Sequence, residues 1–170
     1  PMSPSAVLVG RTNGDLLINS ISMIVMMATG LIVGWRINSS PLEALAAIAL
    51  LLFFAYALSW VMAFIGMSVR SPEVINNVSF LVLFPLTFIS NAFVPAETLP
   101  TPLRVFAELN PVSALVQAAR ELFGNTPVGS AQSDVWSQQH PVLTVLIGIV
   151  VMLAIFVPLS VRKFASISTR

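Results

Sequence analysis

The sequence predicts an all-α membrane protein with four transmembrane helices. Of its 170 residues, 56% are hydrophobic and only 9% are charged, whereas an average soluble domain carries about 25% charged residues. A chain so poor in charge must turn much of its surface toward lipid. In addition, four stretches contain the roughly 20 mostly apolar residues that a helix needs to cross a hydrocarbon core of about 30 Å.

The four expected spans follow one another along the chain. They cover residues 16–35, 42–67, 74–94 and 142–161, and the second is long enough to tilt. A helix of a soluble bundle would show polar residues every three or four positions on its outer face. Residues 48–56 and 145–157 show no such face, so we exclude a soluble bundle.

The charges of the loops orient these spans. With four spans, residues 1–15, the loop around Arg70 and the C-terminal end lie on one side, which holds five basic and two acidic residues. The other side holds three basic and five acidic residues. Because Lys and Arg near span ends favour the cytoplasm, we expect the N- and C-terminal ends inside and residues 95–141 outside the cell.

The region 95–141 is expected to contain two short helices with apolar faces. Thr101-Pro102 and Asn110-Pro111 each combine a capping residue with a proline at a helix start, and Gly124 is a stop signal. The first helix would place Leu103, Phe106 and Leu109 on one face. The second would form an apolar stripe beside the more polar Gln117, Arg120 and Glu121, from residues Val112, Leu115, Val116, Ala119, Leu122 and Phe123.

We expect these two helices to re-enter the bundle or to lie along its outer rim. Residues 125–140 are rich in Asn, Thr, Gly, Ser and Gln and predict an exposed loop.

Composition argues against several functional classes. A net charge of +1 without a clustered basic stripe argues against nucleic-acid binding. The 170 residues include no cysteine that could form a disulfide, bind a metal ion as a thiolate or act as a nucleophile. The span cores hold no Asp, Glu, Lys, Arg or His, which argues against a proton-driven carrier. No HExxH or Gly-x-Ser-x-Gly motif supports intramembrane hydrolysis, and the single His140 receives no role.

One part of the third span differs from the others. Phe84-Pro85 places a proline in mid-span, which removes a backbone hydrogen bond and bends the helix. The kink is either a moving part or purely structural. Phe88, Ser90 and Asn91 follow toward the end of the span, and polar groups there serve either helix packing or a substrate path.

An ordered set of short strings resembles the ABC-2 type permeases, especially the daunorubicin/doxorubicin resistance group. Any one string is weak, but together they run in order through nearly the whole chain. The opening resembles the family's cytoplasmic segment before its third span. The strings are MSPSA at 2–6, GR at 10–11, RSPE at 70–73, FPLTF at 84–88, SNAFVP at 90–95, LP at 99–100, LR at 103–104, NP at 110–111 and AARELFG at 118–124.

The resemblance implies spans three to six of a six-span permease, with short re-entrant helices outside the fifth span. Pro1 is not an initiator methionine and residues 1–15 lack a signal-peptide pattern. We therefore expect the sequence to begin inside a longer protein, as the C-terminal part of a single transmembrane domain covering residues 1–170.

The family implies an exporter in the bacterial cell membrane, moving drugs, complex lipids or polysaccharides. It also implies two partners. One is a separate ATP-binding cassette subunit, which binds ATP and Mg, and the other is a second permease subunit, either identical or different. This chain would be a transport subunit that binds no cofactor and is not itself an enzyme, and it carries no Walker A motif. A non-transporting anchoring or assembly subunit and a fragment of a secondary transporter are the alternatives.

Candidate coupling residues lie on the expected cytoplasmic side. Pro4 can start a helix there with Ser3 as its cap, and Arg11 and Asp15 are four residues apart, close enough to pair on one helical face. Arg70 and Glu73 lie in the loop on the same side. Arg11 either couples to the ATPase or anchors the span among lipid headgroups.

Overall fold

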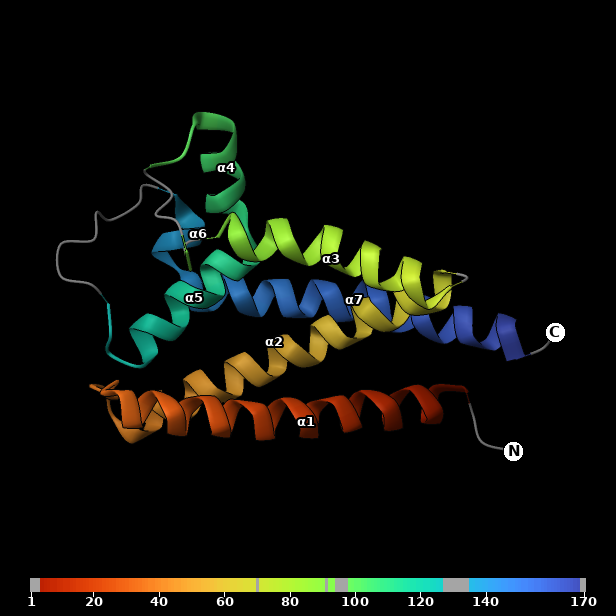
Figure 1. Ribbon diagram of the computed structural model, residues 1–170, viewed down its shortest axis with the longest axis horizontal. Helices are drawn as coiled ribbons and strands as arrows, with labels where there is room; N and C mark the ends of the chain where they lie inside the picture. The colour runs from red at the N-terminus through yellow and green to blue at the C-terminus, as the bar shows by residue number, and fades with distance from the viewer. Residues whose placement is uncertain (1–3, 70, 91, 94–97, 127–134, 169–170) are drawn as a thin grey trace. The chain divides into compact units, whose positions relative to one another are not determined.

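The computed structural model describes residues 4–69, 71–90, 92–93, 98–126 and 135–168, and the regular secondary structure of that part of the chain is entirely helical (Figure 1). The all-α prediction is therefore confirmed. In chain order the helices are α1 (Pro4–Val33), α2 (Pro41–Ser68), α3 (Pro72–Phe88), α4 (Thr101–Leu109), α5 (Pro111–Leu122), α6 (Trp136–Gln139) and α7 (Pro141–Ser168).

Three of these helices are long and apolar enough to cross a membrane. They are α1, α2 and α7, and they correspond to the first, second and fourth expected spans. The third expected span corresponds to α3, an apolar helix of only 17 residues. It ends at Phe88 and not at Val94, and residues 89–90 and 92–93 form turns and bends.

Proline and serine residues explain where the long helices begin. α1 begins at Pro4, as expected, and runs unbroken through Arg11 and Asp15 into the expected span. α2 begins directly after Ser40, whose hydroxyl and backbone N–H both donate to the Glu43 carboxylate, at 2.8 and 2.9 Å. The Glu43 N–H donates back to the Ser40 hydroxyl at 3.3 Å. This reciprocal arrangement satisfies N–H groups that have no partner at a helix start.

The described residues divide into two compact units by their contacts. The first unit comprises residues 1–36, 52–75 and 149–170. Within it α2 and α7 lie side by side (Figure 1), since Phe64 and Phe156 meet edge to face at 5.8 Å between ring centroids. The Ser160 hydroxyl also donates to the Trp60 carbonyl at 3.4 Å, and both residues are almost fully buried.

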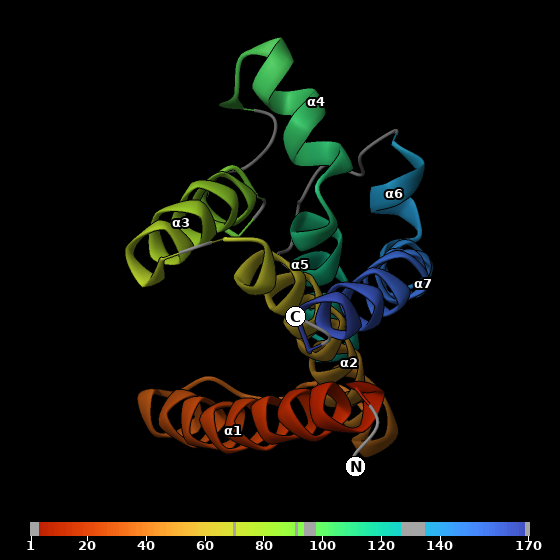
Figure 2. The same ribbon diagram turned by 90° about the vertical axis from the view of Figure 1, so that its right-hand side faces the viewer.

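The second unit comprises residues 37–51 and 76–148 and contains the short helices. Helices α4, α5 and α6 contact one another, and Figure 2 shows them together. We call these three helices the cap. Both predicted cap helices are thus confirmed as helices, and both begin with a proline in the first turn. The third, α6, lies where an exposed loop was expected; that expectation was wrong for residues 136–139, where Ser137 is buried.

Candidate functional site

Asn110 joins the end of α3 to the beginning of α5. Its side-chain amide donates to the carbonyls of Leu86, at 2.7 Å, and Ile89, at 3.1 Å. Its side-chain oxygen accepts from the Val112 N–H at 2.9 Å, which is the helix cap that the Asn-Pro pattern predicted. Asn110 is only 3% exposed. One buried side chain therefore satisfies backbone groups at two helix ends.

These contacts explain why α3 stops earlier than expected. A continuing helix would use the carbonyls of residues 86, 87 and 89 as acceptors for N–H groups four residues later. Asn110 occupies the carbonyls of Leu86 and Ile89, and the buried Ser90 hydroxyl donates to the Thr87 carbonyl at 2.5 Å. The carbonyls at the end of the helix, which lack intrahelical partners, are thus satisfied by side chains.

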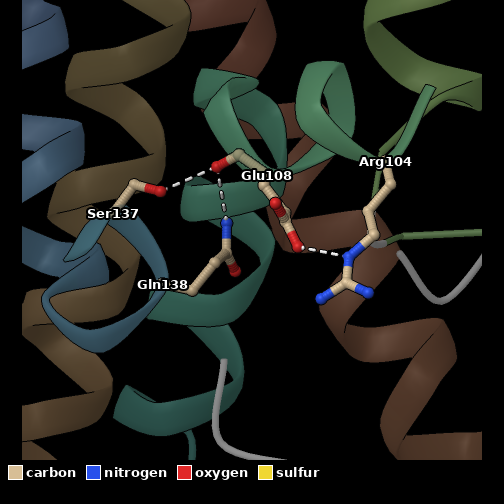
Figure 3. Close-up of polar contacts among 4 residues, drawn as sticks. All are labelled: Arg104, Glu108, Ser137 and Gln138. Atoms are coloured by element: carbon tan, nitrogen blue, oxygen red, sulfur yellow. Dashed lines mark hydrogen bonds and ion pairs between the residues drawn. The ribbon is translucent and has the colours of Figure 1, made fainter. Parts of the chain in front are cut away.

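A second set of polar contacts holds α6 to α4 (Figure 3). The Glu108 carbonyl accepts from the Ser137 hydroxyl at 2.7 Å and from the Gln138 amide at 3.3 Å. The Glu108 carboxylate faces the other way and pairs with Arg104 at 2.8 Å (Figure 3). The Thr144 hydroxyl of α7 donates to the Ser137 carbonyl at 3.2 Å. The cap is thus hydrogen-bonded to the end of α3 and to the start of α7.

The cap helices bury mainly small side chains that lie outside the predicted apolar stripes, although Phe123 of the second stripe is also buried, at 7% exposed. On α5 the fully buried positions are Ser113, Ala114 and Ala118, while Leu115, Pro111 and Arg120 are half-buried. On α4 only Ala107 is buried, and Leu103 and Phe106 are each 41% exposed. Small side chains let neighbouring backbones approach closely, so the packed face is the small one and not the most apolar one.

The C-terminal end of α5 requires a glycine. The Gly124 N–H donates to the Glu121 carbonyl and the Asn125 N–H donates to the Arg120 carbonyl, at 3.0 and 2.8 Å. This pairing needs a left-handed residue, and Gly124 has φ +69°. A Cβ at Gly124 would lie 2.8 Å from the carbonyl carbon of Asn38, whose own N–H donates to the Phe123 carbonyl at 3.0 Å.

Four exposed phenylalanines form a continuous row along α3 and the turn that follows it, and two of them, Phe84 and Phe88, are candidate residues of the third span. Phe84 and Phe88 stack at 4.4 Å between centroids, Phe80 precedes them at 5.1 Å, and Phe93 follows Phe88 at 5.1 Å. All four rings are 45–66% exposed. Pro85 lies inside α3, as expected, and is half-buried. Sequence patterns predicted roles for Phe84 and Phe88. They missed that these rings belong to a continuous phenylalanine ladder, although the four-residue spacing from Phe80 to Phe84 and Phe88 is visible in the sequence. The ladder consists of Phe80, Phe84, Phe88 and Phe93.

The candidate coupling residues lie on two helices. Arg11 is exposed and Asp15 is half-buried on α1, and the structure gives no ion pair between these two described residues. Glu73 is exposed in the first turn of α3. Three candidates lie outside the described residues: Arg70, Asn91 and Ser3, the expected N-capping residue of α1. Among the candidate coupling residues that the structure describes, Arg11, Asp15 and Glu73 form no ion pair with one another.

The polar side chains of the described residues link helices to one another. Within residues 4–69, 71–90, 92–93, 98–126 and 135–168, no three His, Cys, Asp or Glu side chains gather where they could hold a metal ion. The side chains of Asn110, Ser137, Gln138 and Thr144 bond backbone carbonyls of other elements. The Asn38 amide also donates to the Asn125 side-chain oxygen, at 2.8 Å.

Comparisons with known proteins agree with the strings that run through the chain. The family model described as ABC-2 type transporter matches residues 1–124. The daunorubicin resistance ABC transporter permease protein DrrB1 of Streptomyces coeruleorubidus is 32% identical over 164 residues, which is 96% of this chain and 54% of the relative. The chain thus spans about half the length of this curated relative. No solved structure matches it significantly.

The family match covers α1 to α5 and ends at Gly124, the residue that terminates α5. It includes the Asn110 junction and the phenylalanine ladder. With three helices long enough to span a membrane and a family model that matches most of its length, this chain belongs to the ABC-2 type transporter family of multi-pass membrane permeases.

Proposed function

We propose that this chain is part of the permease of an ATP-driven exporter that moves a hydrophobic drug or lipid-like substrate out of a bacterial cell. The family match carries this proposal, and the relative's name, a daunorubicin resistance permease, supports a hydrophobic drug. The absence of ionisable residues from the span cores fits an energy source outside the bilayer. ATP and Mg are bound by a separate cassette subunit, and a second permease subunit completes the path.

Four spans, including α3, are part of the proposal. At about 1.5 Å per residue the 17 residues of α3 extend about 25 Å, slightly less than a hydrocarbon core of about 30 Å. If α3 crosses, the cap faces the outside, as the two short helices outside the fifth span do in the family. Both ends of the chain and the loop around Arg70 then face the cytoplasm.

Cysteine labelling separates four spans from three. The 170 residues contain no cysteine, so Ser68→Cys and Thr126→Cys, both at exposed positions, each introduce a unique thiol into this segment. On intact cells an impermeant maleimide is expected to label the cysteine at position 126 and not the one at position 68. If α3 does not cross, both positions lie on the same side and give the same result, which would overturn the four-span topology.

Energy coupling is tested by charge reversal at Arg11. Arg11 lies near the N-terminal end of α1, exposed and on the side that we assign to the ATPase. In the full-length protein with its ATPase, Arg11→Glu is expected to leave insertion unchanged. Export and permease-stimulated ATP hydrolysis should fall together, by roughly fivefold or more, the low end of typical coupling between sites.

The matched control introduces the same glutamate at nearly the same depth, with a change in net charge of −1 where Arg11→Glu changes it by −2. Asn13→Glu lies two residues further along α1, on another face of the helix, and Asn13 is also exposed. If Arg11 only anchors the helix among headgroups, both variants reduce insertion or orientation. Full export by Arg11→Glu at normal expression would contradict the coupling role. If the unmodified full-length protein neither exports substrate nor stimulates its ATPase, the proposed transporter function is wrong.

A further inference from the structure

Trp60 on α2 has a buried indole N–H without a hydrogen-bond partner. The residue is 2% exposed, and its ring nitrogen exposes less than 1 Å². No polar atom of the residues that the structure describes accepts from this N–H. Buried polar groups are nearly always hydrogen-bonded, and an unpaired donor in hydrocarbon is costly. The N–H therefore points to a partner that this packing of the helices does not supply.

The chain itself closes off this N–H. Because the nitrogen exposes less than 1 Å², neither the rest of a longer protein nor a membrane lipid can bond it while the helices keep this packing. Trp60 also differs from a tryptophan of the membrane interface, which keeps its N–H among the headgroups. The ring of Trp136, by contrast, is 51% exposed. A partner reaches the Trp60 N–H only when a neighbouring helix moves.

The neighbouring helix α7 meets Trp60 through a weak polar contact. The fully buried Ser160 hydroxyl donates to the Trp60 carbonyl at 3.4 Å, longer than the roughly 2.5–3.0 Å that is usual for a hydroxyl donor. Pro158 lies inside α7, shortly before Ser160, where it removes a backbone hydrogen bond and lets the helix bend. A bend at Pro158 would therefore draw Ser160 away from α2 and uncover the Trp60 ring.

The depth of Trp60 limits what its partner can be. The 28 residues of α2 extend about 42 Å, so about 6 Å of helix remains beyond each face of a hydrocarbon core of about 30 Å. Trp60 precedes the end of α2 at Ser68 by about 12 Å, and so lies about 6 Å inside the hydrocarbon, on the side that we assign to the cytoplasm. An apolar molecule dissolved in the inner leaflet reaches this depth, whereas the hydrocarbon offers no water to pair the N–H.

We propose that the contact between Ser160 and Trp60 opens, and that the freed indole N–H then donates a hydrogen bond to an oxygen of the transported substrate. An indole N–H only donates, so it selects a molecule that carries an acceptor. Tyr56, one turn earlier on α2, stands edge to face against the Trp60 ring, at 6.4 Å between centroids. Two aromatic side chains at one place favour an aromatic ring system. The inference rests on the proposed exporter function and names its substrate class, an apolar aromatic molecule with a carbonyl oxygen.

Removing the donor tests the hydrogen bond to the substrate. The full-length protein is assayed with its ATPase in lipid bilayers, with two probes: anthraquinone, which carries carbonyl oxygens, and anthracene, which has the same ring skeleton without them. Trp60→Phe keeps an aromatic ring and removes the N–H. The anthraquinone concentration that half-maximally stimulates ATP hydrolysis should therefore rise about three- to tenfold, as the loss of one hydrogen bond requires. The response to anthracene should not change.

Ser160→Ala should act in the opposite direction. It removes the bond that closes the contact, so the open form becomes more populated and the apparent affinity for the substrate rises. The half-maximal concentration of anthraquinone should fall by about threefold, the effect of one typical hydrogen bond between membrane helices. Ser59→Ala is the matched control, because the Ser59 hydroxyl bonds the Ala55 carbonyl of its own helix, at 3.1 Å. A purely structural role would weaken the response of both the Trp60 and the Ser160 variant.

Thermal unfolding without a probe separates an unpaired N–H from one that is already paired, for example with a bound water. If the N–H is unpaired, Trp60→Phe removes the cost of burying it, which offsets the lost ring volume, and the unfolding temperature should fall by less than about 5 °C. Trp136→Phe, at an exposed ring of the cap, is the control for the loss of a solvated N–H. A larger fall in Trp60→Phe would show that the N–H is paired in the closed form and would overturn the inference.

Two further results would contradict the assignment of Trp60. One is an equal response of the parent and of Trp60→Phe to anthraquinone, and the other is a parent protein that does not respond to anthraquinone at all. If the parent still exports its own substrate at the expense of ATP in either case, the transporter function stands and only the role of Trp60 is wrong.

Discussion

Asn110→Ala is expected to lower the free energy of unfolding by about 2–5 kcal/mol, because it removes three hydrogen bonds at once. A fully buried partner left unsatisfied costs about 1–3 kcal/mol, and the total stays below the sum of three such costs because these bonds are only partly buried. The carbonyls of Leu86 and Ile89 and the N–H of Val112 all lose their partner. Thermal unfolding of the detergent-solubilised protein, followed by the fraction that remains monodisperse, measures the effect.

A shorter polar side chain divides the effect between the two helices. Asn110→Ser should still cap α5, because serine accepts from the N–H groups of a helix start, but it is too short to reach the end of α3 as well. We expect it to recover about 1 kcal/mol of the loss. Asn13→Ala, at an exposed position of α1, is the neutral control. An alanine variant at 110 as stable as the parent would refute the junction.

Gly124→Ala is expected to cost about 2–4 kcal/mol, from a left-handed backbone that a Cβ disfavours by about 1–2 kcal/mol and from overpacking of similar size. The new Cβ would lie 2.8 Å from the carbonyl carbon of Asn38 and 3.0 Å from the carbonyl oxygen. Both neighbours are backbone atoms, so relief requires the loop before α2 to move away from the end of α5. The same thermal assay applies.

Gly148 provides the matched control for this substitution. It lies inside α7, and a Cβ there would meet nothing within 4 Å. Because glycine inside a helix is less favourable than alanine by about 0.5–1 kcal/mol, Gly148→Ala should be neutral or slightly stabilising. Equal losses at positions 124 and 148 would show that the contact with Asn38 does not matter.

Local signals predicted the helices well, and tertiary contacts account for what they missed. Asn110-Pro111 and Gly124 each act within one helical turn, and the structure places a helix start and a helix stop there. α4 also begins at Thr101-Pro102, but Thr101 is its first residue and not its cap, a position that Pro100 holds. The end of α3 depends on Asn110, more than 20 residues later in the chain, so no local pattern could reveal it. The four-residue α6 is too short to produce a periodic pattern.

Burial was harder to predict than helix formation. Hydropathy favoured Leu115 and its neighbours on α5, whereas Ala114 and Ala118 are fully buried. Alanine contributes little to a hydropathy pattern. It is buried here because its small side chain lets neighbouring helices approach closely. Asn110 was predicted from its capping pattern and from the NP string of the family resemblance. Its amide contacts and the role of Ser137 follow only from the fold.

The length of α1 has a mechanical consequence. Its 30 residues extend about 45 Å, so about ten residues remain beyond a hydrocarbon core of about 30 Å. Arg11 and Asp15 lie on this same continuous rod, and no break separates them from the membrane-spanning residues. No hinge loop lies between the protruding end and the embedded part of α1. A sideways force on the protruding end is therefore transmitted along the helix and tilts its embedded part in the membrane.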